Sequence, residues 1–411
     1  MMLFRCSQIL SSVFLLVYAL QTSADSHLLP NDDPVLSEAD FSECKIRFQD
    51  RATKKGISEA TIAQAINSLE ISQRVLELDR KQPEFTSSFA SYLNKRVTDE
   101  RVAQGRELLK RHGGLLNKVS KQYGIPPSYL VSFWGMETNF GSYLGKMSIL
   151  NSLATLGCDK RRSEFFTKEL MNAFTLLDEG VVNLDEFKGS WAGAMGNMQF
   201  MPSAYLKHAV DFDGDGKRDL WKSLDDAMGS AGNFLKNLGW EKGERWGREV
   251  KIESNFDFLQ AGLKNRKSLS EWAKLGVKQA DGRQLPKVEM EAALLVPSGH
   301  QGPAFLVYRN FDVIMRWNKS ESYAIAVGYF ANRIAGMGKL LKSPVESPRL
   351  SRDQVITLQE KLVAGGFSED EPDGILGPNT RAGISRFQNS VGMVADGFPS
   401  SDVLTRLGLS L

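Results

Sequence analysis

The sequence predicts an α+β protein that is mainly helical, with a small antiparallel sheet in a large domain and a small three-helix domain at the C-terminus. Three observations predict this class. Capped, amphipathic helical patterns follow one another from about Ser37 to Leu238. Short β-prone runs lie between Val250 and Trp317. A segment rich in Pro and Ser, Ser343–Pro348, then separates a second stretch of helical pattern.

The first residues have the features of a secretory signal peptide. Arg5 precedes an apolar stretch from Val13 to Leu20, which is too short to span a bilayer, and small residues follow at Thr22–Ala24. We therefore expect cleavage after residues 1–24 and a mature chain without a transmembrane segment. Cys6 precedes the apolar stretch, so nothing indicates a lipid-modified cysteine. The predicted location is the periplasm, as a soluble or wall-associated protein.

Length and charge limit the possible classes. A chain of 411 residues is too long for one ordinary core, so two or more domains are expected. Hydrophobic residues make up 42% and charged residues 24%, as in soluble globular proteins. The net charge is +2 and no long block of one sign occurs, which argues against nucleic acid as a partner.

The helical region contains recognisable start signals. Ser58–Ile66 reads as a capped amphipathic helix, and Asp99–Arg111 reads as another. Pro126 and Pro127 stand where a further helix would begin. That third helix carries the most informative residue of the chain, Glu137.

The spacing of hydrophobic residues changes after about Val250. Val288–Val296 begins by alternating, and Phe305–Tyr308 and Val313–Met315 are short β-prone runs among Gly and Pro residues. These runs predict a small antiparallel sheet. A helical pattern resumes at Tyr323–Tyr329 and is expected to continue to about Leu341.

The domain boundaries follow from composition. We expect the large domain over residues 25–342, a linker over 343–349 and a separate domain over 350–411. The last domain contains a weak internal echo, in which Asp373-Gly374 and Asp396-Gly397 mark turns between helical stretches.

Glu137 is an acid in an apolar setting. Leu130, Phe133 and Trp134 form a stripe at helical spacing, and Glu137 falls on the same stripe. Burial and a helix end near Gly141 would both raise the pKa of such a carboxyl group. A group of this kind can hold a proton near neutral pH and deliver it to a leaving alcohol. The alternative is a structural Glu that reaches solvent or pairs with a basic residue.

A segment rich in Gly and Ala, Gly189–Ser203, suggests a ligand groove. Small residues allow a close approach of backbone, while Ser190 and Gln199 provide hydrogen bonds. Tight helix packing is the alternative interpretation of this segment.

The run Asp211–Asp219 has the pattern of a cation-binding loop. Asp211, Asp213 and Asp215 alternate, Gly216 stands at the sixth position, and the carbonyl of Lys217 is a further ligand. Lys222 occupies the position of the usual closing Glu. A solvated acidic turn is the alternative.

Several ordered motifs together resemble the lytic murein transglycosylase B family, over roughly Phe41 to Met337. The motifs are Gln82–Thr86, Glu137–Gly141, Leu153–Leu156, Arg161–Phe166, Gly193–Pro202 and Asn318–Ala324. The resemblance implies a lysozyme-like domain that cleaves the β-1,4 bond between N-acetylmuramic acid (MurNAc) and N-acetylglucosamine (GlcNAc) of peptidoglycan without water. The product would end in 1,6-anhydroMurNAc.

The same resemblance implies roles for individual residues. Glu137 maps to the single catalytic residue, acid first and then base. The positions that map to the saccharide-binding groove are Ser190, Gln199, Arg161, Arg162 and Asn318. Relatives often carry Tyr where this chain has Phe165 and Trp317, so Trp317 is expected to keep a stacking role without a hydroxyl contact.

The resemblance also implies a bound Ca²⁺ and a wall-binding tail. The family has a longer EF-hand-like loop closed by a later acid, for which Asp225 and Asp226 are the candidates here. The C-terminal motifs resemble a type 1 peptidoglycan-binding domain, so the expected partner is the glycan strand of the wall. No organic cofactor is expected.

Two functional alternatives stay open from sequence. A hydrolytic muramidase could use the same scaffold, and a non-catalytic scaffold could bind peptidoglycan. Cys44 and Cys158 remain after the signal peptide is removed, and a disulfide between them is no more expected than two free thiols.

Overall fold

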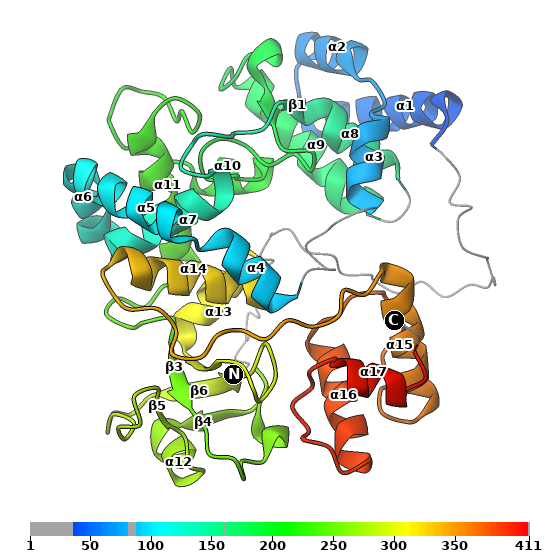
Figure 1. The fold of residues 1–411 in the computed structure, drawn as a ribbon. Helices are drawn as coiled ribbons and strands as arrows, with labels where there is room; N and C mark the ends of the chain where they lie inside the picture. Colours follow the sequence, from blue (N-terminus) through cyan, green and yellow to red (C-terminus); the bar gives the residue numbers. More distant parts are fainter. Residues whose placement is uncertain (1–35, 81–87, 160–161, 410–411) are drawn as a thin grey trace, which may run out of the picture.

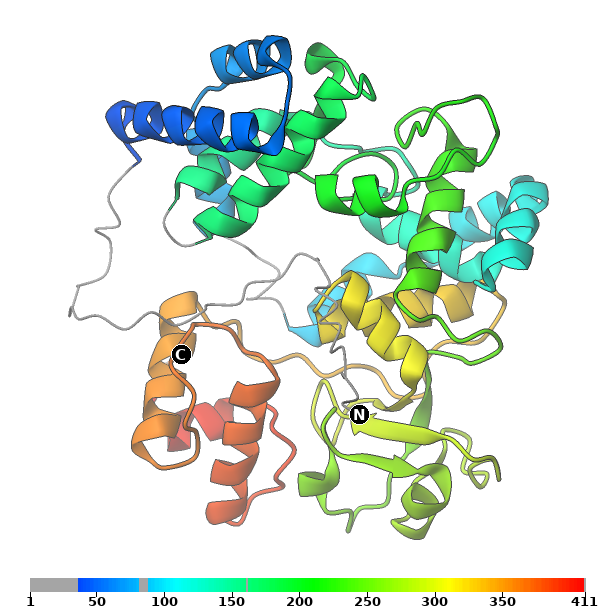
Figure 2. The same ribbon diagram turned by 180° about the vertical axis from the view of Figure 1, so that it is seen from behind.

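The computed structural model describes residues 36–80, 88–159 and 162–409. The predicted signal peptide and the motif at residues 82–86 lie outside the described residues. Helices occupy one end of the molecule, a sheet occupies the other, and the C-terminal helices lie beside the sheet (Figures 1 and 2). The prediction of a mainly helical fold with a small antiparallel sheet is confirmed.

The large domain is built mostly from helices. Their bounds are α1 Glu38–Lys55, α2 Glu59–Ser68, α3 Gln73–Arg80, α4 Phe89–Arg96, α5 Asp99–Arg111, α6 Gly113–Tyr123, α7 Pro127–Thr138, α8 Ile149–Cys158, α9 Ser163–Asp178, α10 Pro202–His208, α11 Leu224–Asn237, α13 Arg309–Trp317 and α14 Glu321–Ile334. A two-stranded ribbon pairs β1 Met147–Ser148 with β2 Lys188–Gly189.

The sheet is antiparallel throughout, with the strand order β4-β6-β7-β3-β5. Its strands are β3 Gly247–Lys251, β4 Arg266–Ser268, β5 Lys278–Gln279, β6 Glu291–Leu295 and β7 Ala304–Val307, and α12 Leu269–Lys274 follows β4 directly. The C-terminal domain consists of α15 Arg352–Ala364, α16 Pro378–Ser390 and α17 Ser401–Arg406. Each of the three parts has its own hydrophobic cluster.

The start signals read from sequence are the observed ones. Ser58 caps α2 by accepting a hydrogen bond from the Thr61 backbone, and α5 spans Asp99–Arg111 as expected. Pro126 is the N-cap of α7, and Pro127 is its first residue.

Two boundaries differ from expectation. Val313–Met315 is not a strand, because it lies inside α13, where Phe311, Ile314 and Trp317 recur at helical spacing on the buried side. The last helix of the large domain ends at Ile334 and not near Leu341. Gly336 follows this helix end with a φ of +95°, a left-handed conformation that stops a helix at low cost for glycine.

Helix α7 lies in the middle of the helical core. Residues Tyr129 to Met136 are all buried, and so is Thr138. Helices α5, α6 and α14 pack against α7. The apolar stripe assumed from sequence therefore underestimates the burial, because the helix is covered on all sides and not on one face.

A disulfide joins Cys44 in α1 to Cys158 at the end of α8, with the two Cα atoms 6.0 Å apart. It connects positions that are 114 residues apart in sequence. Within the described part of the chain, no helix is both long enough and apolar enough to cross a membrane.

We predict that replacing both Cys44 and Cys158 by Ser lowers the free energy of unfolding by about 2–4 kcal/mol, because the unfolded chain regains the freedom of a long loop. Chemical denaturation of the oxidised wild type and the double variant measures the difference. Two free thiols in the oxidised wild-type protein, found by thiol titration under denaturing conditions, would contradict the bridge.

Candidate active site

Glu137 is placed by the C-terminal end of α7. It is only partly buried, while every other residue from Tyr129 to Thr138 is buried. The helix ends one residue later, at Thr138, because Asn139 takes a left-handed conformation with a φ of 49°. The sequence of α7 thus presents one carboxylate at the edge of an otherwise apolar segment.

Two side chains that are distant in the sequence form hydrogen bonds with this carboxylate. The indole N–H of Trp317 donates to Glu137 Oε1 at 2.9 Å, and the hydroxyl of Tyr323 donates to the same oxygen. Trp317 is the last residue of α13, and Tyr323 lies in the first turn of α14. Both donors therefore come from residues about 180 positions along the chain from the acid.

Trp317 does not present a face to a ligand in this structure. Its side chain is 1% exposed, and the rings of Phe133, Phe200 and Phe234 lie against it with centroids 4.7–5.6 Å away. The expected stacking role is therefore wrong for this residue, because neighbouring rings cover its faces. Its polar edge is used to orient Glu137.

Tyr323 is buried as well, at 5% exposure. Burial, together with the neighbouring Glu137 carboxylate, raises the pKa of Tyr323 well above its ordinary value. The hydroxyl consequently keeps its proton and acts as a permanent donor to Glu137. Tyr323 belongs to the Asn318–Ala324 motif, but the sequence analysis assigned it no role of its own.

Ser190 and Gln199 lie in one folded loop between β2 and α10. The Ser190 hydroxyl accepts from the Ala194 backbone at 2.9 Å, and Gln199 donates to the carbonyl of Leu144 at 3.3 Å. Both side chains are partly exposed. The Leu144 contact ties the loop to the segment that follows the Glu137 helix.

Asn197 fixes this loop to α7, a role that the sequence analysis missed. Its side-chain oxygen accepts from the Trp134 indole at 3.0 Å, and its amide donates to the carbonyls of Leu220 and Trp221. Thr138, next to Glu137, donates to the Asn197 carbonyl at 2.9 Å. The only sequence signal for Asn197 is its place in the Gly-Asn-Met-Gln motif, which does not indicate that it connects the loop to α7.

The other groove candidates are Arg161, Arg162 and Asn318. Arg162 forms an ion pair with Asp79, and these side chains are 11% and 3% exposed. Arg161 lies outside the described residues. Asn318 directly follows Trp317, is partly exposed, and accepts from the Ser320 backbone at 3.2 Å. Their roles in sugar binding stay predictions.

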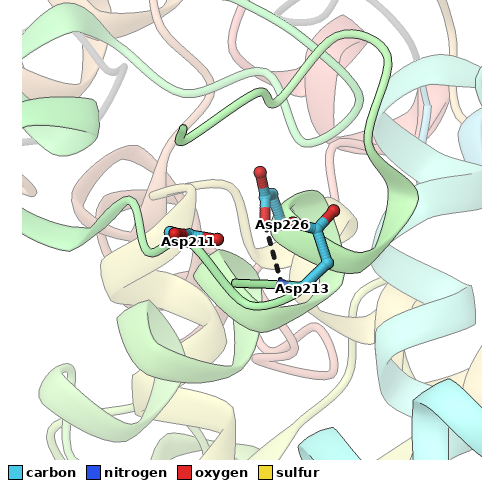
Figure 3. Close-up of side chains that lie close together, drawn as sticks. All are labelled: Asp211, Asp213 and Asp226. Atoms are coloured by element: carbon cyan, nitrogen blue, oxygen red, sulfur yellow. Dashed lines mark hydrogen bonds between the residues drawn. The ribbon is translucent and has the colours of Figure 1, made fainter. Parts of the chain in front are cut away.

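The aspartate loop forms a compact acidic cluster. Oxygen atoms of Asp211, Asp213 and Asp226 all lie within 4.8 Å of one another (Figure 3). Asp226, in the first turn of α11, is the candidate closing acid that joins the loop, and Asp225 is not part of the cluster. Asp215 is also outside this group of three.

The donor chemistry of this cluster fits a hard cation. Burial raises the pKa of Asp226, and the nearby Asp213 adds to the effect. Three carboxylate oxygens at such separations are the ligands that Ca²⁺ prefers.

Comparison with known proteins decides the family. The model of the transglycosylase SLT domain matches residues 40–332, which is more than half of the chain. The chain belongs to the transglycosylase SLT family. A second model, described as a putative peptidoglycan-binding domain, matches residues 351–407 of this SLT-family chain. The resemblance found from sequence, and with it the enzyme class of a peptidoglycan lytic transglycosylase, is confirmed.

Individual SLT-family relatives are similar over different lengths. The membrane-bound lytic murein transglycosylase B of Escherichia coli (strain K12) is 36% identical over 250 residues, which is 59% of this chain and 66% of that relative, slightly less than two thirds. SltB3 from Pseudomonas aeruginosa, solved in complex with NAG-anhNAM-pentapeptide, is 42% identical and covers 90% of this chain and 99% of its own, with a TM-score of 0.85. The Escherichia coli lytic transglycosylase SLT35 in complex with calcium is 32% identical over 71% of this chain and 92% of its own, with a TM-score of 0.62.

For the site of this SLT-family chain, we predict that Tyr323→Phe lowers kcat by about 10- to 100-fold, because a hydrogen bond to a charged group contributes about 1.5–3 kcal/mol. Trp317→Phe, which removes the other donor to Glu137, should act in the same direction. Steady-state kinetics on soluble peptidoglycan fragments measure both effects. Far-UV circular dichroism must show intact folding, and wild-type kcat in both variants would contradict the assignment.

Proposed function

We propose that the protein cleaves the β-1,4 bond between MurNAc and GlcNAc without water and leaves 1,6-anhydroMurNAc ends. The single observation that carries this proposal is the setting of Glu137. It is a partly exposed carboxylate at the end of a buried helix, and it accepts hydrogen bonds from Trp317 and Tyr323.

The two donors distinguish the oxygens of the carboxyl group. Because Oε1 accepts both the indole N–H and the phenol O–H, the proton of the acid form belongs on Oε2. Oε2 donates this proton to the glycosidic oxygen as the C1–O bond of MurNAc breaks. The GlcNAc hydroxyl leaves with the proton, and Glu137 is then a carboxylate that Oε1 hydrogen bonds stabilise.

The second half of the reaction reverses the role of Glu137. The acetamido oxygen of MurNAc stabilises the anomeric carbon after the bond breaks. The sugar's own 6-hydroxyl then attacks C1, and Oε2 accepts its proton. Atoms balance without water, and Glu137 returns to its starting state.

A single acid is consistent with the contacts of three other carboxylates in the helical part of the chain. Ordinary glycosidases need two carboxyl groups across the bond. Asp178 instead accepts hydrogen bonds from Ser58, and Glu186 pairs with Lys222 at 3.0 Å. Glu179 pairs with Arg218 at 3.4 Å. All of these pairs lie at exposed or half-exposed positions.

Peptidoglycan strands are the proposed substrate and partner. SltB3 was solved with NAG-anhNAM-pentapeptide, which is a fragment with an anhydro end, and its similarity covers both domains of this chain. We assign the groove to the loop of Ser190 and Gln199, together with Asn318 and the paired arginines. The matched tail domain would hold the enzyme on the wall, and the location would be the periplasm.

We predict that Glu137→Gln lowers kcat by on the order of 10³-fold, since general acid–base catalysis contributes typically 10²–10⁴. Digestion of purified sacculi followed by mass spectrometry of the products measures this. The wild-type products should be lighter by one water than those of a hydrolytic muramidase. Products with a reducing MurNAc end would replace the proposal with hydrolysis, and the absence of any turnover would replace it with a binding scaffold.

We also propose that Asp211, Asp213 and Asp226 hold a Ca²⁺ ion, with Asp215 and the Lys217 carbonyl as further ligands of the loop. SLT35 was solved with calcium, and the three carboxylates fit this ion. When bound, Ca²⁺ would neutralise the acidic cluster and tie the loop to α11. It takes no part in the reaction steps above.

Calcium should therefore raise the melting temperature. At a free concentration 100 times its Kd, a ligand adds about 2.7 kcal/mol to stability. Differential scanning fluorimetry in EDTA and in CaCl₂ measures the shift, and MgCl₂ is the control for ionic strength. Asp211→Asn should reduce the shift. Equal melting temperatures in EDTA and CaCl₂ for the wild type would refute the metal site.

A further inference from the structure

The two Asp-Gly turns of the C-terminal domain share one pattern of hydrogen bonds. In the first turn, the side chain of Gln359 donates to Asp373 Oδ1 at 2.7 Å and accepts from the Gly374 backbone at 2.8 Å. The backbone N–H of Ile375 donates to the same Asp373 oxygen at 2.8 Å. Gly374 has a φ of +74°, and a Cβ at this position would lie 2.6 Å from Cγ of Arg352. The Arg352 side chain therefore passes directly beside the first turn.

The second turn repeats this arrangement. The side chain of Gln388 donates to Asp396 Oδ1 at 2.8 Å and accepts from the Gly397 backbone at 2.7 Å. The backbone N–H of Phe398 donates to Asp396 Oδ1 at 2.9 Å. Gly397 has a φ of +69°, and a Cβ at this position would lie 2.7 Å from the carbonyl oxygen of Arg381. An arginine thus lies beside the second turn as well.

The two arginines occupy the same position in their helices. Arg352 of α15 precedes Gln359 by seven residues, and Arg381 of α16 precedes Gln388 by seven residues. The weak internal echo of the sequence is therefore a structural repeat. In both copies the inner hydrogen bonds use the Oδ1 atom of the aspartate, which leaves Oδ2 and the arginine for contacts outside the repeat.

The second copy uses these groups to bind a peptide segment of the large domain. Asp396 Oδ2 accepts from the backbone N–H of His300 at 2.9 Å, and His300 Nδ1 lies 2.7 Å from the same oxygen. Arg381 donates to the carbonyl of Pro297 at 3.1 Å. The fit is close, because the Asp396 side chain is only 4% exposed and a Cβ on Gly299 would lie 2.7 Å from Asp396 Oδ2. One arginine and one aspartate thus hold a short segment by a carbonyl and an N–H.

The first copy is open to solvent. Arg352 and Asp373 are both exposed, and in the part of the chain that the structure describes Asp373 Oδ2 has no hydrogen-bond partner. Arg352 makes a long contact of 3.4 Å to the Asp373 carbonyl. Helix α16 packs beside η3 Phe258–Gln260 of the large domain, while α15 lies beyond α16 from the sheet in both views (Figures 1 and 2). The large domain therefore covers the second copy and leaves the first one accessible.

We propose that Arg352 and Asp373 form a binding site for the stem peptides of peptidoglycan, with the contacts that their equivalents make to the large domain. The Asp373 carboxylate accepts a backbone N–H of the peptide, and the Arg352 guanidinium donates to a carbonyl or carboxylate of the same peptide. The inference rests on the proposed function, because attachment to the wall brings the peptide to this site.

The chemistry of the docked copy favours a peptide over a glycan as the ligand. Its two contacts go to a carbonyl and an N–H of one backbone segment, and not to hydroxyl groups. A stem peptide offers both groups along its backbone and ends in a carboxylate, which an arginine can bind in a bidentate manner. The tail domain would then recognise the peptide part of the wall, while the groove beside Glu137 takes the glycan strand.

Binding of a stem pentapeptide with a fluorophore at its N-terminus to the full chain tests the site, and fluorescence anisotropy measures the Kd. Asp373→Asn keeps an oxygen for the inner hydrogen bonds but replaces the other oxygen by an amide group, which cannot accept an N–H. It should raise the Kd by about 10- to 100-fold, the effect of a lost hydrogen bond to a charged group. Arg352→Gln leaves the inner hydrogen bonds of the turn intact and should raise the Kd in the same way. Asp353→Asn is the matched control, since Asp353 is an exposed acid next to Arg352 but outside the turn, and its Kd should stay at the wild-type value.

Co-sedimentation with sacculi relates this site to wall binding, in a Glu137→Gln background so that the wall is not digested. An excess of unlabelled pentapeptide should lower the bound fraction of this protein and leave that of the Glu137→Gln/Asp373→Asn double variant unchanged. Peptide-free glycan strands, as a competitor for the groove, should act equally on both proteins.

Two results would overturn the stem-peptide site. The first is a wild-type chain that does not bind the pentapeptide, and the second is a wild-type Kd in both Asp373→Asn and Arg352→Gln. Either result is compatible with attachment through the glycan. A wild-type chain that fails to sediment with sacculi would instead refute the proposed wall attachment itself.

Discussion

The site depends on one shared acceptor, the Oε1 atom of Glu137, which receives hydrogen bonds from Trp317 and Tyr323. Helix α7 can carry this acid at its end only because the rest of its final turns are buried and fix its position. The two donors come from α13 and α14, which are also buried in the helical core. A rigid apolar support therefore positions a single polar group with little freedom to move.

The same interaction explains why distant segments must assemble before the site exists. Trp317 reaches the acid because Phe133, Phe200 and Phe234 surround its ring. Phe200 belongs to the loop of Ser190 and Gln199, so the packing that orients the acid also places the proposed groove. Asn197 adds hydrogen bonds between this loop and α7. Elsewhere in the helical part, the disulfide joins α1 to α8.

Much of the fold could be read from local patterns. Caps at Ser58 and Pro126 mark helix starts, because they satisfy or pre-set the first turn without help from the rest of the chain. Val313–Met315 was misread, since a short β-prone run carries no information about its helical neighbours on either side. The aspartate loop was recognisable, but its closing residue was not, because Asp225 and Asp226 differ only in the direction they face from α11.

The sequence by itself determined the mainly helical class, and it indicated Glu137 as the proposed acid, the acidic loop and the peptidoglycan-binding domain, because each is carried by residues close together in the chain. Only the tertiary structure decided that Trp317 and Tyr323 both donate to Glu137, that Cys44 meets Cys158, and that Asp396 and Arg381 contact the large domain. The physical reason is that each of these contacts joins residues tens to hundreds of positions apart. Their side chains meet only after apolar burial has fixed the helices, and no local period or cap encodes that meeting.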